Sequence, residues 1–478
     1  MSLSSKAYTG ALWSIFQFCG AQFSTTIVLL ILARILGAEA FGLIALASVY
    51  IGFVQIIIEQ GFAVAIIQRR ELEAEHLDTA FWLGLGFSAL IAGVTFIFAK
   101  NIAAIFQEQQ LAGIIQWLSL SFIFRSLNSV QEALLKRDLN FKSLSVRTLG
   151  ANIAAGITGV VMAYAGFGIW SLVGRQLAEV GVATILLWTF IEWRPNFKVS
   201  PKHFRELFSY GISITGNRVA LFVSRRADDF LIGYFLGPIY LGYYTIAYRF
   251  VEIAIRVISA SLNRVVVPAF SQVQDDLIKV RKGFYKVTEL LSYVSIPFFT
   301  FVALLSSEIT LRILGDEWTE SIFILKVLSF YGMLQIILMY NGSMMDAMGK
   351  PGWNFVINTI FSIFSVVTFT LVVSWGINAV AAVYVVRGYL LCPISVLAIR
   401  QLIKINIKKY VYTLLKPICL SLLIAATIFG VKLALPDTID SLIVISISAT
   451  AYIVIFAVFL VKFSPEIILD IREAALKG

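Results

Sequence analysis

The chain has 478 residues, of which 59% are hydrophobic and only 14% are charged, and its mean hydropathy is +0.87. Soluble domains contain roughly 45–50% apolar and about 25% charged residues, so this composition excludes a soluble globular protein. The net charge of +10 would suggest a nucleic acid partner in a soluble protein, but in a membrane protein it indicates basic cytoplasmic loops and an anionic ligand, with no nucleic acid.

Apolar stretches long enough to cross a bilayer, which takes about 20 residues, follow one another along the whole chain. The first follows a single lysine and has no small-residue cleavage site before it, so we interpret it as a transmembrane helix rather than a removable signal peptide. We predict an all-α polytopic membrane protein with fourteen transmembrane helices, at about 9–36, 40–66, 78–99, 111–134, 145–165, 168–191, 207–236, 240–268, 287–306, 321–347, 353–374, 377–399, 411–432 and 441–461.

The distribution of basic residues tests this count, because Lys and Arg accumulate in cytoplasmic loops. With the N-terminus inside, the inner segments hold at least 20 Lys and Arg residues and the outer segments at most 4. A missed or invented helix would invert every later loop and destroy this alternation. The pattern therefore predicts fourteen spans with both termini in the cytoplasm.

The polar segments between the spans carry no sign of an enzyme. The longest outer loop, Ser306 to Glu320, spans about 15 residues, which is too short for a catalytic domain outside the membrane. The three cysteines have no CxxC spacing, and His76 and His203 cannot form a HExxH motif. We therefore expect no catalytic residues, no metal site and no cofactor.

Two segments 200 residues apart are similar and indicate an internal repeat. ILARILGAEAFGLIALA from Ile31 and LIGYFLGPIYLGYYTIA from Leu231 share Leu, two Gly and an Ala at matching positions, including the pairs Gly37 with Gly237 and Gly42 with Gly242. Glycine permits a tight hairpin and a close approach of helices. We predict two six-helix lobes, residues 1–200 and 201–405, and an additional helix pair with a cytoplasmic tail at 406–478.

Ionisable residues inside spans are costly and should face a bundle interior or a water-filled cavity. The seventh span carries Arg218, Arg225 and Asp229 within about 40° of one helix face. The eighth carries a similar polar stripe, which includes Arg249, Glu252 and Arg256, and Arg264 lies off this stripe on the same span. Because arginines exceed carboxylates here, we interpret these five arginines as a binding site for an external anion, with Glu252 and Asp229 tuning its charge or carrying a coupling proton.

Smaller polar sets occur in other spans. Each acid in them lies within one or two turns of an arginine or an amide on its own helix, so a neutralised structural pair and a functional role remain open. These residues are Arg125, Asn128 and Glu132 in the fourth span, Arg175 and Glu179 in the sixth, Gln55 and Glu59 in the second, and Arg387 in the twelfth.

Five stretches spread along the chain resemble one known family. The sequence is similar to the lipopolysaccharide-biosynthesis and colanic-acid type flippases, in the polysaccharide-transport branch of the multidrug, oligosaccharidyl-lipid and polysaccharide exporter superfamily. The stretches are LARILGAEAFG from Leu32, EQGFAVAIIQR from Glu59, LLKRDLNFKSL from Leu134, FGIWSLV from Phe167 and VVPAFSQVQDD from Val266.

The resemblance implies that the two lobes enclose a central cavity that opens alternately to each side. It implies a flippase that moves polyprenyl-pyrophosphate-linked oligosaccharide from the cytoplasmic to the outer leaflet of a bacterial inner membrane, for exopolysaccharide or lipopolysaccharide biosynthesis. Expected partners are this substrate, membrane lipids and the polysaccharide assembly machinery, with the protein itself a monomer. The superfamily also suggests coupling to H⁺ or Na⁺, which the residues do not decide.

Two alternatives belong to other functional classes. A cation-coupled drug exporter of the same superfamily would carry cationic cargo, which surplus arginine would repel. A membrane-embedded polysaccharide polymerase or ligase would need catalytic groups at the outer face, where the loops are short. The arginine stripes therefore favour the anionic lipid-linked substrate.

Overall fold

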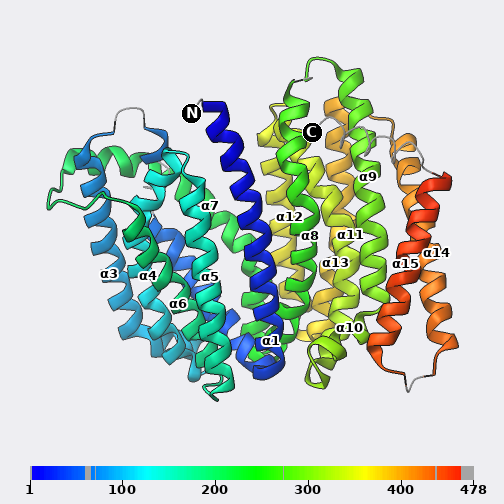
Figure 1. Cartoon of the computed structure of the whole chain (residues 1–478), viewed down its shortest axis with the longest axis horizontal. Helices are drawn as coiled ribbons and strands as arrows, with labels where there is room; N and C mark the ends of the chain where they lie inside the picture. Colours follow the sequence, from blue (N-terminus) through cyan, green and yellow to red (C-terminus); the bar gives the residue numbers. More distant parts are fainter. Residues whose placement is uncertain (1–2, 60–65, 70–71, 273, 437–438, 464–478) are drawn as a thin grey trace. The chain divides into compact units, whose positions relative to one another are not determined.

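The computed structural model describes residues 3–59, 66–69, 72–272, 274–436 and 439–463, and in this part of the chain all regular secondary structure is helical (Figure 1). The short elements α10 (Ser306–Ile313), η1 (Asp316–Trp318) and η2 (Val373–Trp375) connect longer helices. These are α1 (Leu3–Glu59), α3 (Ala74–Ile105), α4 (Gln110–Arg137), α5 (Phe141–Tyr164), α6 (Trp170–Phe190), α7 (Pro201–Phe235), α8 (Pro238–Gln272), α9 (Leu277–Leu304), α11 (Thr319–Ala347), α12 (Pro351–Val372), α13 (Ile377–Ile403), α14 (Ile407–Ala434) and α15 (Ser441–Phe463).

Each predicted span overlaps one of these helices. The first two are the two parts of α1, which is interrupted at Gly37, where φ is 72° and ψ is 178°. Among the described residues, nine helical segments are long and apolar enough to cross a membrane. The protein is thus an all-helical, multi-pass membrane protein, while the number fourteen stays a prediction.

Large apolar side chains on the outside of α3 show where this helix meets lipid. Leu90, Val94 and Ile97 are 64%, 47% and 73% exposed, and their spacing places them on one face of the helix. The opposite side carries small or polar buried residues, among them Ser88 and Ala99. A helix that is apolar on its exposed face requires a lipid environment, because water would make that exposure unfavourable.

Contacts divide the chain into two compact units, Met1–Gly242 (unit 1) and Tyr243–Gly478 (unit 2). In unit 1, α5 packs on α6 and α1, α3 packs on α4, and α7 packs on α1 and α3. In unit 2, α9 packs on α14 and α11, α13 packs on α11 and α12, and α15 packs on α14. The lobes predicted from the repeat divide the chain elsewhere, at residue 200, and they stay a prediction.

The repeated glycines lie at a close approach of two backbones in unit 1. A Cβ at Gly42 would overlap the carbonyl group of Pro238, and a Cβ at Gly242 would overlap the carbonyl group of Ala38. The contacts are reciprocal, since positions 38 and 42 meet positions 238 and 242. Gly237 has a positive φ of 88°, as Gly37 does. Glycine is needed at Gly42 and Gly242 because any side chain would push the two backbones apart.

Candidate functional site

A polar cavity of about 310 Å³ lies within unit 1, lined by residues of α1, α3, α4, α5, α6 and α7. Its walls combine small side chains such as Gly84 and Ala151 with many charged groups. Charge inside a membrane bundle is costly unless it faces partners or water. The charged and amide residues of the lining are Gln55, Glu59, Arg125, Asn128, Glu132, Lys136, Arg147, Asn152, Glu179 and Arg218.

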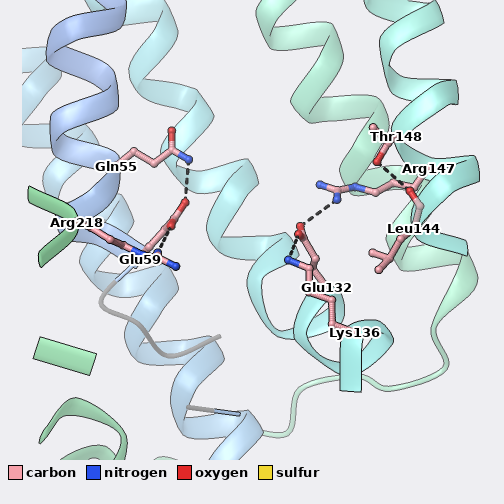
Figure 2. A network of polar contacts seen from close by, with 8 residues as sticks. All are labelled: Gln55, Glu59, Glu132, Lys136, Leu144, Arg147, Thr148 and Arg218. Carbon is pink, nitrogen blue, oxygen red and sulfur yellow. Dashed lines mark hydrogen bonds and ion pairs between the residues drawn. The ribbon is translucent and has the colours of Figure 1, made fainter. Parts of the chain in front are cut away.

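Glu132 is held between two cations at one side of this cavity (Figure 2). Its carboxylate lies 2.7 Å from Lys136 Nζ, one turn further along α4, and accepts a hydrogen bond of 2.9 Å from Arg147 Nη1 on α5. The connection from α4 to α5 is short, and Asn140 caps the start of α5 by accepting from the Ser143 backbone N–H. This tight turn brings Arg147 beside the last turns of α4.

Glu59 forms a second polar cluster, at the end of α1 (Figure 2). Its Oε2 accepts a hydrogen bond of 2.9 Å from Arg218 Nη1, and its Oε1 accepts one of 3.0 Å from Gln55 Nε2. The Gln55 contact is the one expected from the i,i+4 spacing. Arg218, expected on an anion-binding stripe, is therefore paired with a carboxylate and lines the cavity.

The charges of the lining do not cancel. The cations Arg125, Lys136, Arg147 and Arg218 outnumber the anions Glu59, Glu132 and Glu179 by one. Arg125 is exposed and makes no ion pair among the described residues. Asn128 Oδ1 and Arg147 Nε are buried without a hydrogen-bond partner in the same part of the chain. Arg147 Nε–H is thus an available donor and Asn128 Oδ1 an available acceptor. The cavity can therefore offer N–H donors of its arginines and one net cationic charge to an anionic group.

Arg225 and Asp229 are the other two residues of α7 that the sequence places in the anion-binding site. The side chain of Arg225 lies outside the described residues. Asp229 is 6% exposed, and its Oδ2 lies 2.6 Å from Arg226 Nη1. Arg226 is off the predicted stripe, but a spacing of three residues still places it beside Asp229 on a helix. Asp229 thus neutralises an arginine that we had not assigned to the site.

The predicted residues of α8 lie in unit 2. Glu252 and Arg256 form an i,i+4 ion pair with 3.0 Å between Oε2 and Nη2, and their side chains are 40% and 51% exposed. Arg249 is half-buried, and the side chain of Arg264 lies outside the described residues. Arg218 therefore belongs to one unit, and Arg249, Glu252 and Arg256 belong to the other.

Comparison with known proteins assigns the chain to a family. The family model described as polysaccharide biosynthesis protein matches residues 31–323, which is more than half of the chain and includes every residue of the cavity. The chain belongs to the polysaccharide biosynthesis protein family. This match confirms the resemblance that we inferred from the five sequence stretches.

Curated relatives of this polysaccharide biosynthesis protein match it over most of their length. The teichuronic acid biosynthesis protein TuaB of Bacillus subtilis (strain 168) is 25% identical and covers 87% of this chain and 86% of its own. The lipopolysaccharide biosynthesis protein WzxC of Escherichia coli (strain K12) is also 25% identical, with 88% and 87% covered.

Solved structures show the same fold at lower identity. Lipid II flippase MurJ in an inward closed conformation has a TM-score of 0.77 at 15% identity, covering 96% of this chain and all of its own. An inward-facing multidrug resistance MATE family transporter of the MOP superfamily has a TM-score of 0.61 at 15% identity, covering 80% and 94%. The polysaccharide biosynthesis protein thus has the fold of these transporters.

Sequence reasoning identified five of the seven charged residues of the cavity but not their arrangement. It left Arg125 and Glu132 open between a structural and a functional role, and it did not single out Arg147 or Lys136 as site residues. Both are basic residues near predicted span ends, where they fit a cytoplasmic loop equally well. A signal was present in the short α4–α5 connection, because a tight turn between antiparallel helices brings residues on either side of it together.

Proposed function

We propose that this protein is a flippase that moves polyprenyl-pyrophosphate-linked oligosaccharide repeat units from the cytoplasmic to the outer leaflet by alternating access. It serves exopolysaccharide or lipopolysaccharide biosynthesis and is a transporter rather than an enzyme. The observation that carries the proposal is the charged cavity of unit 1, located within the region that matches the polysaccharide biosynthesis family. Arg125 has no carboxylate partner among the described residues. A pyrophosphate group would supply an anionic partner for it.

The proposed topology follows from the distribution of basic residues. Fourteen spans with both termini in the cytoplasm place at least 20 Lys and Arg residues inside and at most 4 outside. The protein acts as a monomer in the bacterial inner membrane, with two six-helix lobes and an additional C-terminal helix pair. Transport is coupled to H⁺ or Na⁺, with Glu252 and Asp229 as the carboxylates that tune the charge of the site or carry a coupling proton.

Arginine suits the proposed cargo because its guanidinium group binds phosphate through two parallel hydrogen bonds. We assign Arg125 to the headgroup, with Arg218 as a further contact in the same cavity of unit 1. Arg249 and Arg256 of unit 2 stay predicted substrate-binding residues. Arg218 and Arg256 have carboxylate partners in the structure. Substrate binding therefore requires each of these two arginines to do one of two things. It either contacts a phosphate oxygen while keeping its carboxylate partner, or leaves that partner for phosphate oxygens.

The test is translocation in a bacterial strain that lacks its own flippase and accumulates lipid-linked repeat units in the cytoplasmic leaflet. Arg125→Ala, Arg249→Ala and Arg256→Ala should each reduce outer-leaflet delivery, by about 10- to 100-fold where one hydrogen-bonded charge is lost. Arg312→Ala is the matched control, because Arg312 lies 3.8 Å from Asp440 in an exposed pair that contributes little.

The result separates the proposed function from its alternatives. Loss of delivery with retained membrane insertion supports the assignment of the arginines. Unchanged delivery in all three variants refutes that assignment. A second strain, in which only the gene of this chain is deleted, tests the polymerase alternative. Single repeat units that accumulate on its outer leaflet would identify a polymerase, since the block would then follow translocation.

A further inference from the structure

Both histidines of this chain lie against each other in unit 1, although they are far apart in the sequence. His76 is the third residue of α3 and His203 is the third residue of α7, and their ring centroids are 4.0 Å apart. They are 1% and 4% exposed. A polar ring that is this strongly buried normally has hydrogen-bond partners for its nitrogens.

Two carboxylates face the ring of His203. Its Nε2 lies 3.4 Å from Glu73 Oε2, and its Nδ1 lies 3.8 Å from Glu75 Oε2. Nδ1 is buried and has no hydrogen-bond partner in the described part of the chain. The glutamates are on the solvent side, with side chains 66% and 45% exposed. The ring thus presents one nitrogen to each of two accessible acids.

The distance between His203 Nε2 and Glu73 Oε2 fits a shared cation better than a direct hydrogen bond. A hydrogen bond between a protonated nitrogen and a carboxylate is about 2.7–2.9 Å long, which is shorter than the 3.4 Å between Nε2 and Glu73 Oε2. Two ligands at about 2.0–2.1 Å from one tetrahedral Zn²⁺ ion lie about 3.4 Å apart. A metal between these atoms would accept the lone pairs of both.

His76 supplies a third ligand from the same helix start. Its Nδ1 accepts a hydrogen bond of 3.2 Å from the backbone N–H of Glu73, in a capping box that fixes the first turn of α3. Ligand atoms of Glu73, His76 and His203 all lie within 4.8 Å of one another. A metal would take the place of the Glu73 N–H as the partner of Nδ1.

We propose that Glu73, His76 and His203 bind one divalent transition metal ion, with Zn²⁺ as the best fit to two imidazoles and one carboxylate. Glu75 then accepts the Nδ1–H of His203, as carboxylates do behind metal-bound histidines, and orients the ring. Water from the exposed side completes the coordination. We had expected no metal site because neither histidine belongs to a local motif, but this site joins residues from two helices.

The segment between α6 and α7 holds the site together before any metal binds. Trp82 Nε1 donates to the Asn196 carbonyl at 2.8 Å, and the Asn196 N–H donates to Asp78 Oδ1 at 3.0 Å. The ring of Phe197 stacks on Trp82 with centroids 4.5 Å apart. Since α3 and the segment before α7 are already docked, a metal would add a crosslink between two preorganised helix starts.

The experiment uses the full-length chain in detergent, purified through a histidine-free tag and stripped with a chelator. Co²⁺ is the spectroscopic probe, because tetrahedral Co²⁺ absorbs visible light strongly, and Zn²⁺ is then added to displace it. We expect one ion per chain and a melting temperature that rises with Zn²⁺ concentration. His76→Ala, His203→Ala and Glu73→Gln should abolish both effects.

Two further variants make the result specific. Glu75→Gln should weaken Zn²⁺ binding by about 10- to 100-fold while the tetrahedral Co²⁺ spectrum remains. A variant with Cys19, Cys392 and Cys419 changed to Ala should bind metal unchanged. Because Glu73 is exposed, Glu73→Gln tests the site even where removal of a buried histidine prevents folding. The proposal fails if the wild-type chain binds no stoichiometric ion, or if Glu73→Gln binds as the wild type does.

Discussion

The close approach at Gly42 and Gly242 gives the sharpest prediction about stability. In Gly42→Ala, the new Cβ would lie 2.9 Å from the Cα of Pro238 and would overlap its carbonyl group. In Gly242→Ala, it would lie 3.1 Å from the Cα of Ala38, again overlapping the carbonyl. The obstruction is backbone, which cannot rotate away. We therefore expect a cost near the upper end of the usual range for overpacking, about 3 kcal/mol for each variant.

The assay is the melting temperature of the purified protein in detergent. Unit 1 has 242 residues, and about 2–4 °C per kcal/mol is typical of domains of 150–250 residues, so we expect a decrease of about 6–12 °C. Gly93→Ala on α3 is the control, because a Cβ there meets nothing within 4 Å. It should leave the melting temperature unchanged or raise it slightly through better helix propensity.

The double variant tests whether the two glycines share one contact region. Once Gly42→Ala has forced the backbones apart, Gly242→Ala has less overlap left to create, so the double variant should cost less than the sum of the single ones. Strict additivity would show that the two sites act independently. A melting temperature of Gly42→Ala equal to that of Gly93→Ala would refute the packing argument itself.

Three other predictions concern the ends of helices and the cavity. Glu132→Gln leaves two neighbouring cations without their anion and, discounted for partial exposure, should destabilise the protein by about 1–2 kcal/mol in a melting assay, with Glu132→Asp intermediate. Asn406→Ala removes the cap that accepts from the Lys409 N–H and should cost about 1 kcal/mol, which Asn406→Asp should restore. The carboxylate of Asp276 accepts a hydrogen bond from the backbone N–H of Lys279, and this bond is the main reason why the pKa of Asp276 lies below its ordinary value of 3.8. The carboxylate therefore stabilises the folded protein fully at pH values above 3.8, and this stabilisation is lost as the pH falls through the lowered pKa. The difference in melting temperature between wild type and Asp276→Asn should shrink between pH 5 and pH 3, and a constant difference would contradict the role of the charge.

Most helix positions could be predicted from the sequence because hydropathy reports where the chain can meet lipid. The starts of α7 and α9 are two of the larger differences. The seventh span was expected from residue 207 and α7 begins at Pro201, while the ninth was expected from 287 and α9 begins at Leu277. Both helices continue into polar sequence outside the apolar stretch, where caps such as Asp276 rather than hydropathy decide the boundary.

The sites were harder to predict because they depend on contacts between helices. The Glu59–Gln55 contact follows from helical periodicity, and the sequence predicts it. The contact of Glu59 with Arg218 depends on how α1 and α7 pack, which one sequence does not reveal. The same holds for His76 and His203. Their surroundings are polar in the sequence, yet both rings are buried by tertiary packing that local composition does not encode.

The docked segment before α7 has a practical consequence for engineering. Residues 191–200 contain no regular secondary structure, and such a stretch between two helices would ordinarily be chosen for an epitope tag or a fluorescent protein. Here its backbone N–H groups at Asn196 and Ser200 donate to side chains of Asp78 and Thr79 on α3. An insertion would break these bonds and leave the two side chains buried without partners, so this connection should tolerate insertions as poorly as the interior of a helix.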